Sequence, residues 1–426
     1  MSKLALLGGE PVIKEVFPAF NTIGNEERQS VLDVLDTKVL SGFLGAPSEE
    51  FNGGRYVREL ESSWCEKFNV KHSISVNSAT SGLYTAMGAA GISPGDEVIL
   101  PPYTMSATAM APLIYGGIPV FADIEKDTFC IDPKSVKNLI TNKTKAIVVV
   151  NLFGHPASLH ELKKIADSNN LVMIEDNSQA PLAKENNKYA GTIGHIGVFS
   201  LNRHKHIQSG EGGVCVTDSD DYANRMKLIR NHGENLVESY GVTNVCNMIG
   251  FNYRQTELGA AIAKCQLDKA EAIVARVISQ AEKLSSALSG MTGIEVPLVK
   301  EKSEHVYYVW ASKFKKSAVG ISRKVFASAL CAEGVPVNEG YVKPLYYLPV
   351  FKNMLAFGDK KYPFSLSQIK YEKGLCPVAE RMHFEEELGF AMCSYDLSDA
   401  DISKIIDAWH KVYENKNELL TANIRL

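Results

Sequence analysis

The chain has 426 residues, of which 45% are hydrophobic and 22% are charged, and its formal net charge at pH 7 is −4. This length is too great for a single hydrophobic core and predicts two domains. Basic and acidic residues are interspersed, so the sequence lacks the basic footprint of proteins that bind nucleic acid or an anionic membrane surface.

The N-terminal segment gives no sign of a targeting signal. Its apolar run is short, and no stretch of the chain approaches the ~20 apolar residues of a membrane span. We therefore expect a cytoplasmic protein with no membrane partner.

The residue types that usually bind metals are scattered. The eight cysteines include no C-x-x-C pair, which argues against zinc ribbons and iron–sulfur clusters. His204 and His206 flank a lysine, but alternate residues of an extended segment point to opposite sides. We therefore expect no metal site.

The first part of the chain alternates between strand and helix patterns. An arm and a helix from residue 25 precede a loop rich in glycine and polar residues at 41–56. The alternation predicts a mostly parallel sheet covered by helices on both faces, an α/β fold. Strands are predicted at 73–77, 97–100, 119–122, 146–152, 172–176, 196–200 and 213–217, and helices at 58–68, 106–115, 133–140 and 159–168.

The second part has a different texture. A proline-free helix is predicted over 254–288, followed by a strand at 305–314, a helix at 322–333, a loop at 341–349 and a final helix at 398–413. This pattern predicts a smaller α+β domain. We therefore divide the chain into a large domain with an N-terminal arm, residues 1–265, and a linking helix with a small C-terminal domain, residues 266–426.

Lys205 lies between two predicted strands, just before the glycine-rich turn SGEGG at 209–213. A lysine in a partly desolvated cleft has a lowered pKa, and its free amine can form a Schiff base with a carbonyl compound such as pyridoxal phosphate (PLP). Taken alone the motif is weak, because most lysines beside such turns are solvated loop residues.

A PLP site also needs an acid at the pyridine nitrogen. Asp176 ends an apolar strand, and ligands of open α/β sheets lie beyond the carboxyl ends of the strands. Gln179 follows three residues later and could donate to the ring hydroxyl. The alternatives are a helix cap for Asp176 and a surface amide for Gln179.

Anion donors for the phosphate are predicted in the segment SATSG at 78–82, which follows a strand and opens a helix. Backbone N–H groups and the hydroxyls of Thr80 and Ser81 could hold the phosphate, and Ser200 could add another hydroxyl. The alternative is an ordinary helix cap.

Eight segments together resemble the sugar aminotransferase family (the DegT/StrS group) of fold-type I PLP enzymes. The resemblance covers nearly the whole chain. The segments are NSATSGL (77–83), GDEVILPPYTMSATA (95–109), IPVFADI (118–124), TKAIVVVNLFGHPA (144–157), IEDNSQA (174–180), GTIGHIGVFS (191–200), SGEGG (209–213) and GFNYRQTELGAAI (250–262).

The resemblance implies roles for individual residues. Lys205 binds PLP covalently, Asp176 lies against the pyridine nitrogen and Gln179 lies near the ring. The phosphate is held by Thr80, Ser81 and Ser200. The resemblance also implies a homodimer with shared active sites, in which Asn252 reaches the phosphate in the site of the other subunit.

Met105 departs from the family pattern. The residue that stacks on the ring, after Pro-x-x-Thr, is often Phe or Trp in the family but is Met105 here. A thioether still packs well on an aromatic face. The alternative is that Met105 only fills the core.

The implied reaction is ping-pong transamination from an amino acid, with glutamate as the expected donor, to a keto or aldehyde sugar. We expect a nucleotide-linked acceptor in lipopolysaccharide, other surface polysaccharide or secondary-metabolite amino-sugar biosynthesis. Substrate contacts are expected from the loops at 41–56 and 341–351. Cations near the cleft loops could bind its diphosphate; they are Arg55, Arg58, Arg203 and Lys343.

Three alternatives to this function remain from the sequence. The acceptor could be an unactivated sugar, such as an oxidised octulosonic acid that becomes an 8-amino sugar acid. Some family relatives dehydrate deoxysugars with PLP, but in them histidine stands in place of the lysine that is Lys205 here. A non-catalytic regulator with the PLP fold is the third alternative.

Overall fold

The computed structural model describes residues 3–421. Its main sheet has seven strands in the order β1-β9-β8-β5-β4-β2-β3. β9 runs antiparallel to both of its neighbours, and the other neighbouring strands are parallel. The strands are His72–Val76 (β1), Glu97–Leu100 (β2), Ile118–Phe121 (β3), Thr144–Val150 (β4), Val172–Asp176 (β5), Ile196–Ser200 (β8) and Gly213–Thr217 (β9).

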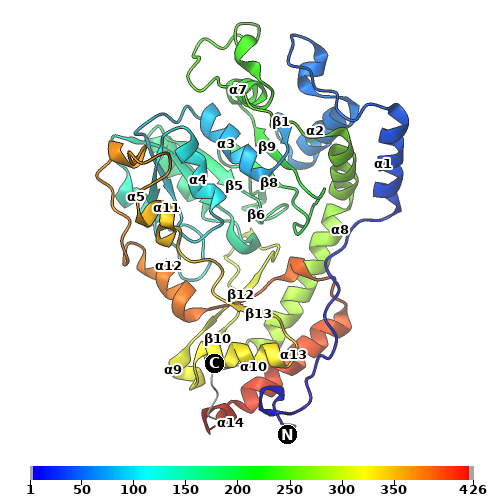
Figure 1. Cartoon of the computed structure of the whole chain (residues 1–426). Coiled ribbons are helices and arrows are strands. Elements are labelled where there is room, and N and C mark those ends of the chain that lie inside the picture. The colour runs from blue at the N-terminus through cyan, green and yellow to red at the C-terminus, as the bar shows by residue number, and fades with distance from the viewer. Residues whose placement is uncertain (1–2, 422–426) are drawn as a thin grey trace.

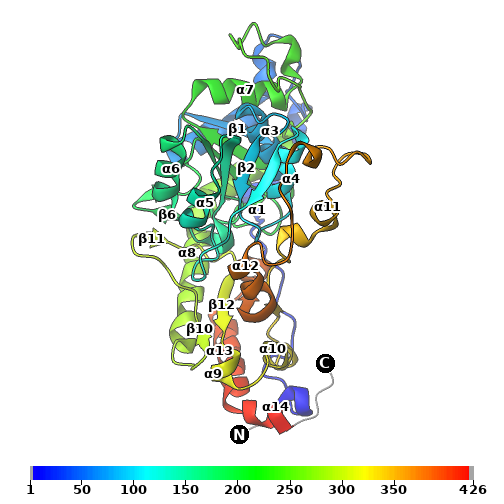
Figure 2. The ribbon, with the colours of Figure 1, turned by 90° about the vertical axis from the view of Figure 1, so that its left-hand side faces the viewer.

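Helices cover both faces of this sheet. Figure 2 shows α5 and α6 on one side of the sheet and α3 and α4 on the other. The predicted α/β fold with a mostly parallel sheet is confirmed. The helices of this part are Asn25–Thr37 (α1), Arg55–Phe68 (α2), Ala79–Ala89 (α3), Ala107–Ile114 (α4), Pro133–Leu139 (α5), Leu159–Ser168 (α6) and Asp220–Arg230 (α7).

A second sheet of four antiparallel strands has the order β10-β12-β14-β13. The strand predicted at 305–314 begins only at Trp310. The strands are Ile294–Glu295 (β10), Trp310–Phe314 (β12), Val337–Glu339 (β13) and Glu387–Phe390 (β14), and the further helices are Glu257–Leu288 (α8), Lys316–Val319 (α9), Arg323–Ala332 (α10), Pro349–Lys352 (α11), Pro377–Arg381 (α12), Asp399–Glu414 (α13) and Lys416–Thr421 (α14).

A third, small sheet joins the two parts of the chain. Its order is β11-β6-β7, with Lys184–Glu185 (β6), Lys188–Tyr189 (β7) and Ser303–Glu304 (β11). The pairing of β6 with β11 thus ties a loop of the large domain to a segment that follows α8.

Two hydrophobic cores underlie the two larger sheets, and α8 runs from one to the other (Figure 1). The predicted boundary at residue 265 falls inside α8, whose Leu267 packs in the first core and whose Leu284 packs in the second. The N-terminal arm contributes Phe17 to the second core, and the later segment around Phe351 packs on the first. The chain therefore crosses between the cores more than once.

Within residues 3–421, no helix combines the length and the apolar character that a membrane crossing requires.

Candidate active site

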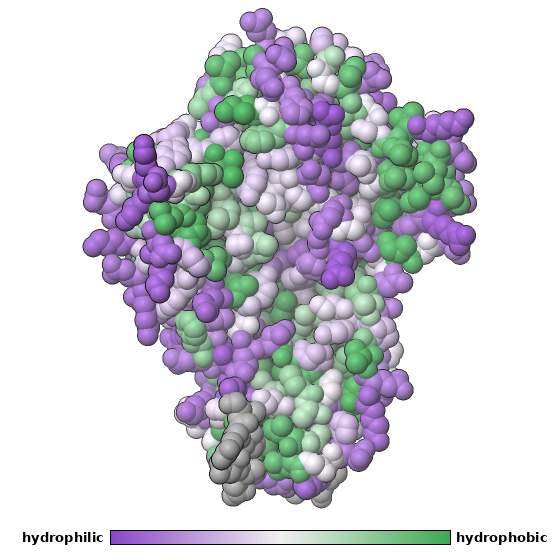
Figure 3. All heavy atoms as spheres, in the orientation of Figure 1, coloured by the Kyte–Doolittle hydropathy of each residue, from purple (hydrophilic) through white to green (hydrophobic). Residues whose placement is uncertain are grey.

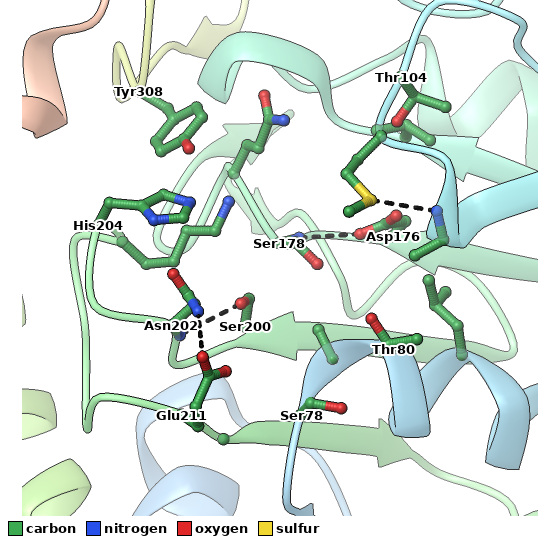
Figure 4. Close-up of a pocket in the computed structure, with 18 of the residues that line it drawn as sticks. Ser78, Thr80, Thr104, Asp176, Ser178, Ser200, Asn202, His204, Glu211 and Tyr308 are labelled. Carbon is green, nitrogen blue, oxygen red and sulfur yellow. Dashed lines mark hydrogen bonds between the residues drawn. The ribbon is translucent and has the colours of Figure 1, made fainter. Parts of the chain in front are cut away.

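A cavity of about 200 Å³ lies where β5 and β8 end, beside the first turn of α3. Figure 4 shows Ser78 and Thr80 at the start of that helix, across the cavity from His204 and Tyr308. Most of the residues proposed from the sequence line this cavity: Thr80, Met105, Asp176, Gln179, Ser200 and Lys205.

Lys205 lies on the connection between β8 and β9 and is only 7% exposed. Burial lowers the pKa of its ammonium to about 8, and the negative charge of Asp176 opposes this shift. Its Nζ lies 4.2 Å from the centroid of the Tyr308 ring. The amine is therefore available in its free, nucleophilic form at a pH far below that of an exposed lysine.

The segment around Lys205 forms turns and bends, so the expectation of an extended segment there is wrong. His206 is buried, and its Nε2 donates to the carbonyl of Val306 at 2.8 Å. His204 instead lines the cavity, where burial lowers the pKa of its imidazole to about 4 and keeps it neutral. Among the described residues, no three His, Cys, Asp or Glu side chains form a group that could hold a metal ion.

Asp176 is buried at the end of β5, and neighbours hold both of its oxygens. Oδ2 accepts from the Thr108 hydroxyl at 2.9 Å, and Oδ1 accepts from the Ser178 N–H at 3.2 Å. The chain continues from Asp176 into turns and then β6, so the alternative of a helix cap is wrong. Asp176 is a fixed carboxylate at the cavity wall.

Gln179 is buried, so the alternative of a surface amide is wrong. Its Oε1 accepts from the Phe153 N–H at 2.8 Å, and its Nε2 donates to the Tyr341 hydroxyl at 3.0 Å. An amide nitrogen has two hydrogens, so a second donor remains for the cavity that Gln179 lines.

The first turn of α3 brings hydroxyls and backbone donors to the cavity, the kind of groups that bind an anion at a helix start. Ser78 is the N-cap and accepts from the Ser81 N–H at 3.0 Å, and it lines the cavity with Thr80 and Ser200. Ser81 does not line it, because its hydroxyl donates to Asn77 at 2.6 Å. A Cβ at Gly213 would lie 2.7 Å from the N atom of Ala79, so only glycine lets β9 pass this close to the helix start.

Met105 lies over the cavity and is 54% exposed, which excludes the alternative of a core filler. Its sulfur accepts from the Ala107 N–H at 3.1 Å, at the start of α4. This contact holds the thioether at the cavity mouth, where it can pack on a flat ring.

Asn252 is exposed and does not line the cavity of its own chain. The four cations proposed for a diphosphate do not line it either. The Arg55 guanidinium pairs with Glu59 at 2.7 Å, and Arg58 donates to the Gly53 carbonyl at 2.8 Å. Within one chain, the cavity is therefore built without these groups.

Several lining residues were missed by the sequence reasoning. Ser78 and Glu211 belong to sequence motifs shared with the family, and Tyr341 begins a loop proposed for substrate contacts. These three residues could therefore have been predicted from the sequence. Tyr308 comes from the segment before β12 and had no such signal. The missed residues are Ser78, Thr104, Ser178, Asn202, His204, Glu211, Tyr308 and Tyr341.

Comparison with known proteins decides the family. The model of the DegT/DnrJ/EryC1/StrS aminotransferase family matches residues 30–386. The chain belongs to this family. The site has the groups that PLP needs. The buried amine suits the aldehyde of PLP, the fixed carboxylate suits the pyridine nitrogen, and the donors at the helix start suit the phosphate. The protein is a PLP-dependent aminotransferase.

The chain of this DegT/DnrJ/EryC1/StrS aminotransferase is also similar to individual sugar aminotransferases. GDP-perosamine synthase of Caulobacter vibrioides is 32% identical over 80% of this chain and 87% of that protein. A putative L-glutamine:3-amino-2,3-dideoxy-scyllo-inosose aminotransferase of Streptomyces kanamyceticus is 31% identical over 99% of both chains.

Solved structures are also similar. The crystal structure of DesI in the presence of its TDP-sugar product superposes with a TM-score of 0.82 at 26% identity, covering 98% of both chains. A GDP-4-keto-6-deoxymannose-3-dehydratase superposes with a TM-score of 0.76 at 26% identity, covering 93% of this chain and all of the other.

Proposed function

We propose that this enzyme moves an amino group from glutamate to a keto or aldehyde carbon of a sugar. The observation that carries the proposal is the buried Lys205 amine in a cavity that also holds Asp176 and a helix-start anion site. A cytoplasmic role in amino-sugar biosynthesis for lipopolysaccharide, other surface polysaccharides or secondary metabolites fits this reaction.

The bound PLP supplies a carbonyl that accepts and returns the amino group, and a ring that withdraws electrons. In our proposal Lys205 would hold the cofactor through Nζ, and its amine would carry the proton to and from the reacting carbon atoms. Asp176 would keep a proton on the ring nitrogen, Gln179 would contact the ring hydroxyl, and Met105 would pack on the ring face. Thr80 and Ser200 would bind the phosphate with Ser78, and Ser81 would support them by donating its backbone N–H to the Ser78 hydroxyl.

Covalent capture tests this site directly. Purified protein loaded with PLP should absorb in the visible range, and borohydride should fix the cofactor on the peptide that contains Lys205. An adduct on another lysine would overturn the assignment. Lys188, which is exposed, serves as the matched control, because its replacement should leave the adduct in place.

We favour a nucleotide-linked acceptor, because several relatives carry nucleotide-sugar names: GDP-perosamine synthase and DesI with its TDP-sugar product. Such an acceptor needs cations for its diphosphate, and Arg203 and Lys343 are candidates because they are close in the chain to the lining residues His204 and Tyr341. Nucleoside diphosphates should then inhibit turnover, and the inhibition should weaken with salt. If nucleoside diphosphates do not inhibit turnover, an unactivated sugar acid becomes the better-supported acceptor.

The dehydratase and regulator alternatives are less well supported. A dehydratase is among the similar solved structures, but this chain has Lys205 where the dehydrating relatives have histidine. Conversion of labelled glutamate to 2-oxoglutarate in the presence of a keto-sugar would separate transamination from both alternatives.

We propose a homodimer with shared sites, because two features of one chain call for a partner. Apolar side chains on and after α1 are about half exposed, and Figure 3 shows them as a hydrophobic patch over that helix. Asn252 is exposed and lies outside the cavity of its own chain. The residues of the patch are Leu32, Leu35, Val39 and Leu40.

Subunit mixing tests the sharing. Lys205→Ala and Asn252→Ala chains should each be impaired alone, and their mixture should regain part of the activity, because one of the two sites in a mixed dimer is intact. Unchanged activity after proven exchange of subunits would contradict the proposal.

A further inference from the structure

A second cavity, of about 330 Å³, adjoins the cofactor cavity. Tyr308 and Tyr341 line both cavities, and Asn338, Glu339 and Glu387 from β13 and β14 supply the other polar groups of the second. A molecule that occupies the second cavity therefore lies beside the Tyr308 ring, whose centroid is 4.2 Å from the reactive amine of the first. The second cavity is placed to hold the distal part of a substrate.

Glu387 is the unusual group in this wall. The residue is only 1% exposed, yet its Oε2 has no hydrogen-bond partner among the described residues. A Cβ at Gly389 would lie 2.5 Å from Oε1, so the glycine leaves the space that the carboxyl group occupies. Buried polar atoms nearly always have partners, and an unpaired one beside a cavity points to a ligand that donates to it.

The charged groups around Glu387 indicate which kind of ligand could donate a hydrogen bond to it. Arg323 is the nearest cation, but its Nη1 donates to the main-chain carbonyl of Glu387 at 2.8 Å and its Nε lies 3.5 Å from Glu339. Lys313 pairs with Glu387 in the strand register, but its ammonium is bound by Asp127. No Lys, Arg or His residue lines the second cavity. A phosphate or carboxylate entering it would face two carboxyl groups without a compensating cation.

We propose that the second cavity binds an amino group that the acceptor sugar already carries, with Glu387 accepting its N–H. This inference rests on the proposed function and narrows its acceptor to amino sugars or related amino-bearing polyols. An ammonium supplies the missing donor and also a positive charge, and such charge-assisted bonds are about twice as strong as neutral ones. A hydroxyl would supply the donor alone.

Binding of an ammonium should also change the protonation of Glu387. Burial raises the pKa of its carboxyl group to about 8, against the opposing effects of Arg323, the Gly340 N–H and Tyr103. At pH 7 the empty site is therefore mostly protonated, and an arriving ammonium displaces that proton to the buffer.

The test uses the borohydride-reduced holoenzyme, in which the fixed cofactor cannot react with an added amine. Isothermal titration compares D-glucosamine and kanosamine, which carry the amine on different ring carbons, with neutral D-glucose. At pH 7 at least one amine should bind about tenfold more tightly than glucose. Titration in buffers of different ionisation enthalpy should show net proton release for that amine and none for glucose.

Two variants separate a specific contact from a general charge effect. Glu387→Gln should lose both the preference and the proton release. Glu386→Gln should keep both, because Glu386 pairs with Lys315 at 2.8 Å and with Arg381 at 3.0 Å and does not line the cavity. The proton count of the wild-type enzyme needs no variant, so poor folding of Glu387→Gln would not leave the proposal undecided.

Equal affinity for glucose and both amines, or a preference that survives Glu387→Gln, would overturn the inference. Failure of the proposed function would look different, since PLP would then not be fixed on Lys205 at all.

Discussion

Each of the two adjoining cavities is lined by a buried ionisable group that burial shifts toward its neutral form, Lys205 in the first and Glu387 in the second. The pKa of Lys205 is lowered to about 8, and the pKa of Glu387 is raised to about 8. The difference lies in their surroundings. Asp176, which faces the lysine's cavity, has partners for both oxygens, whereas Glu387 has an oxygen with none. The carboxylate of the first cavity is therefore fully hydrogen-bonded, while the carboxyl group of the second lacks a donor that a substrate can provide.

The largest effect on turnover is expected at Lys205, the buried amine of the first cavity. Lys205→Ala removes both the cofactor anchor and the proton carrier, so turnover should fall by about 10³-fold or more. Steady-state transamination assays measure the loss. Lys188→Ala, on an exposed strand, should keep wild-type turnover, and a Lys205→Ala enzyme with near-normal turnover would remove the lysine from the mechanism.

Asp176→Asn tests whether the first cavity depends on charge as well as shape. The amide keeps the size of the side chain but loses the negative charge at the ring nitrogen, so turnover should fall by about 10²- to 10³-fold while PLP stays bound. Cofactor absorbance and turnover measured together check this. Asp167→Asn at a half-exposed ion pair is the control, and equal slowing in both variants would point to a general structural effect.

Met105→Ala should weaken cofactor binding without abolishing it. Sulfur–aromatic contacts contribute about 0.3–1.5 kcal/mol, so the Kd for PLP should rise by roughly two- to tenfold. Equilibrium dialysis against PLP measures the change. Met105→Leu keeps the size of the side chain, so its Kd for PLP should lie between those of the wild type and Met105→Ala. An unchanged Kd in both variants would exclude a stacking contact.

Glu387→Gln should produce the smallest effect, a change in the pH dependence of stability. The folded pKa of Glu387 is raised above its unfolded value, so its contribution is fully present below about 4.5 and is lost as pH rises toward about 8. The variant cannot ionise, so its Tm relative to wild type should rise by about 1–3 °C across that window. Thermal unfolding at several pH values checks the sign, and a Tm difference independent of pH would mean that the carboxyl titrates normally.

Much of the first cavity could be predicted from the sequence, because its residues stand at the ends of strongly patterned strands. Asp176 ends a buried strand, and Lys205 stands between two others, so the positions of both follow from local pattern. The prediction was wrong where it depended on the direction in which a side chain points. Ser81 has the expected position, but its hydroxyl donates to Asn77 and not into the cavity.

The sequence by itself determined the alternating strands and helices, the lysine before the glycine-rich turn and the family, since these depend on neighbours along the chain. Only the tertiary structure decided that Tyr308 and Tyr341 line the cavity of Lys205, and that Glu387 lies buried with an unpaired oxygen. These residues come from segments far apart in the chain. No local pattern reports that β13, β14 and the segments of Tyr308 and Tyr341 come together, and these segments line the second cavity.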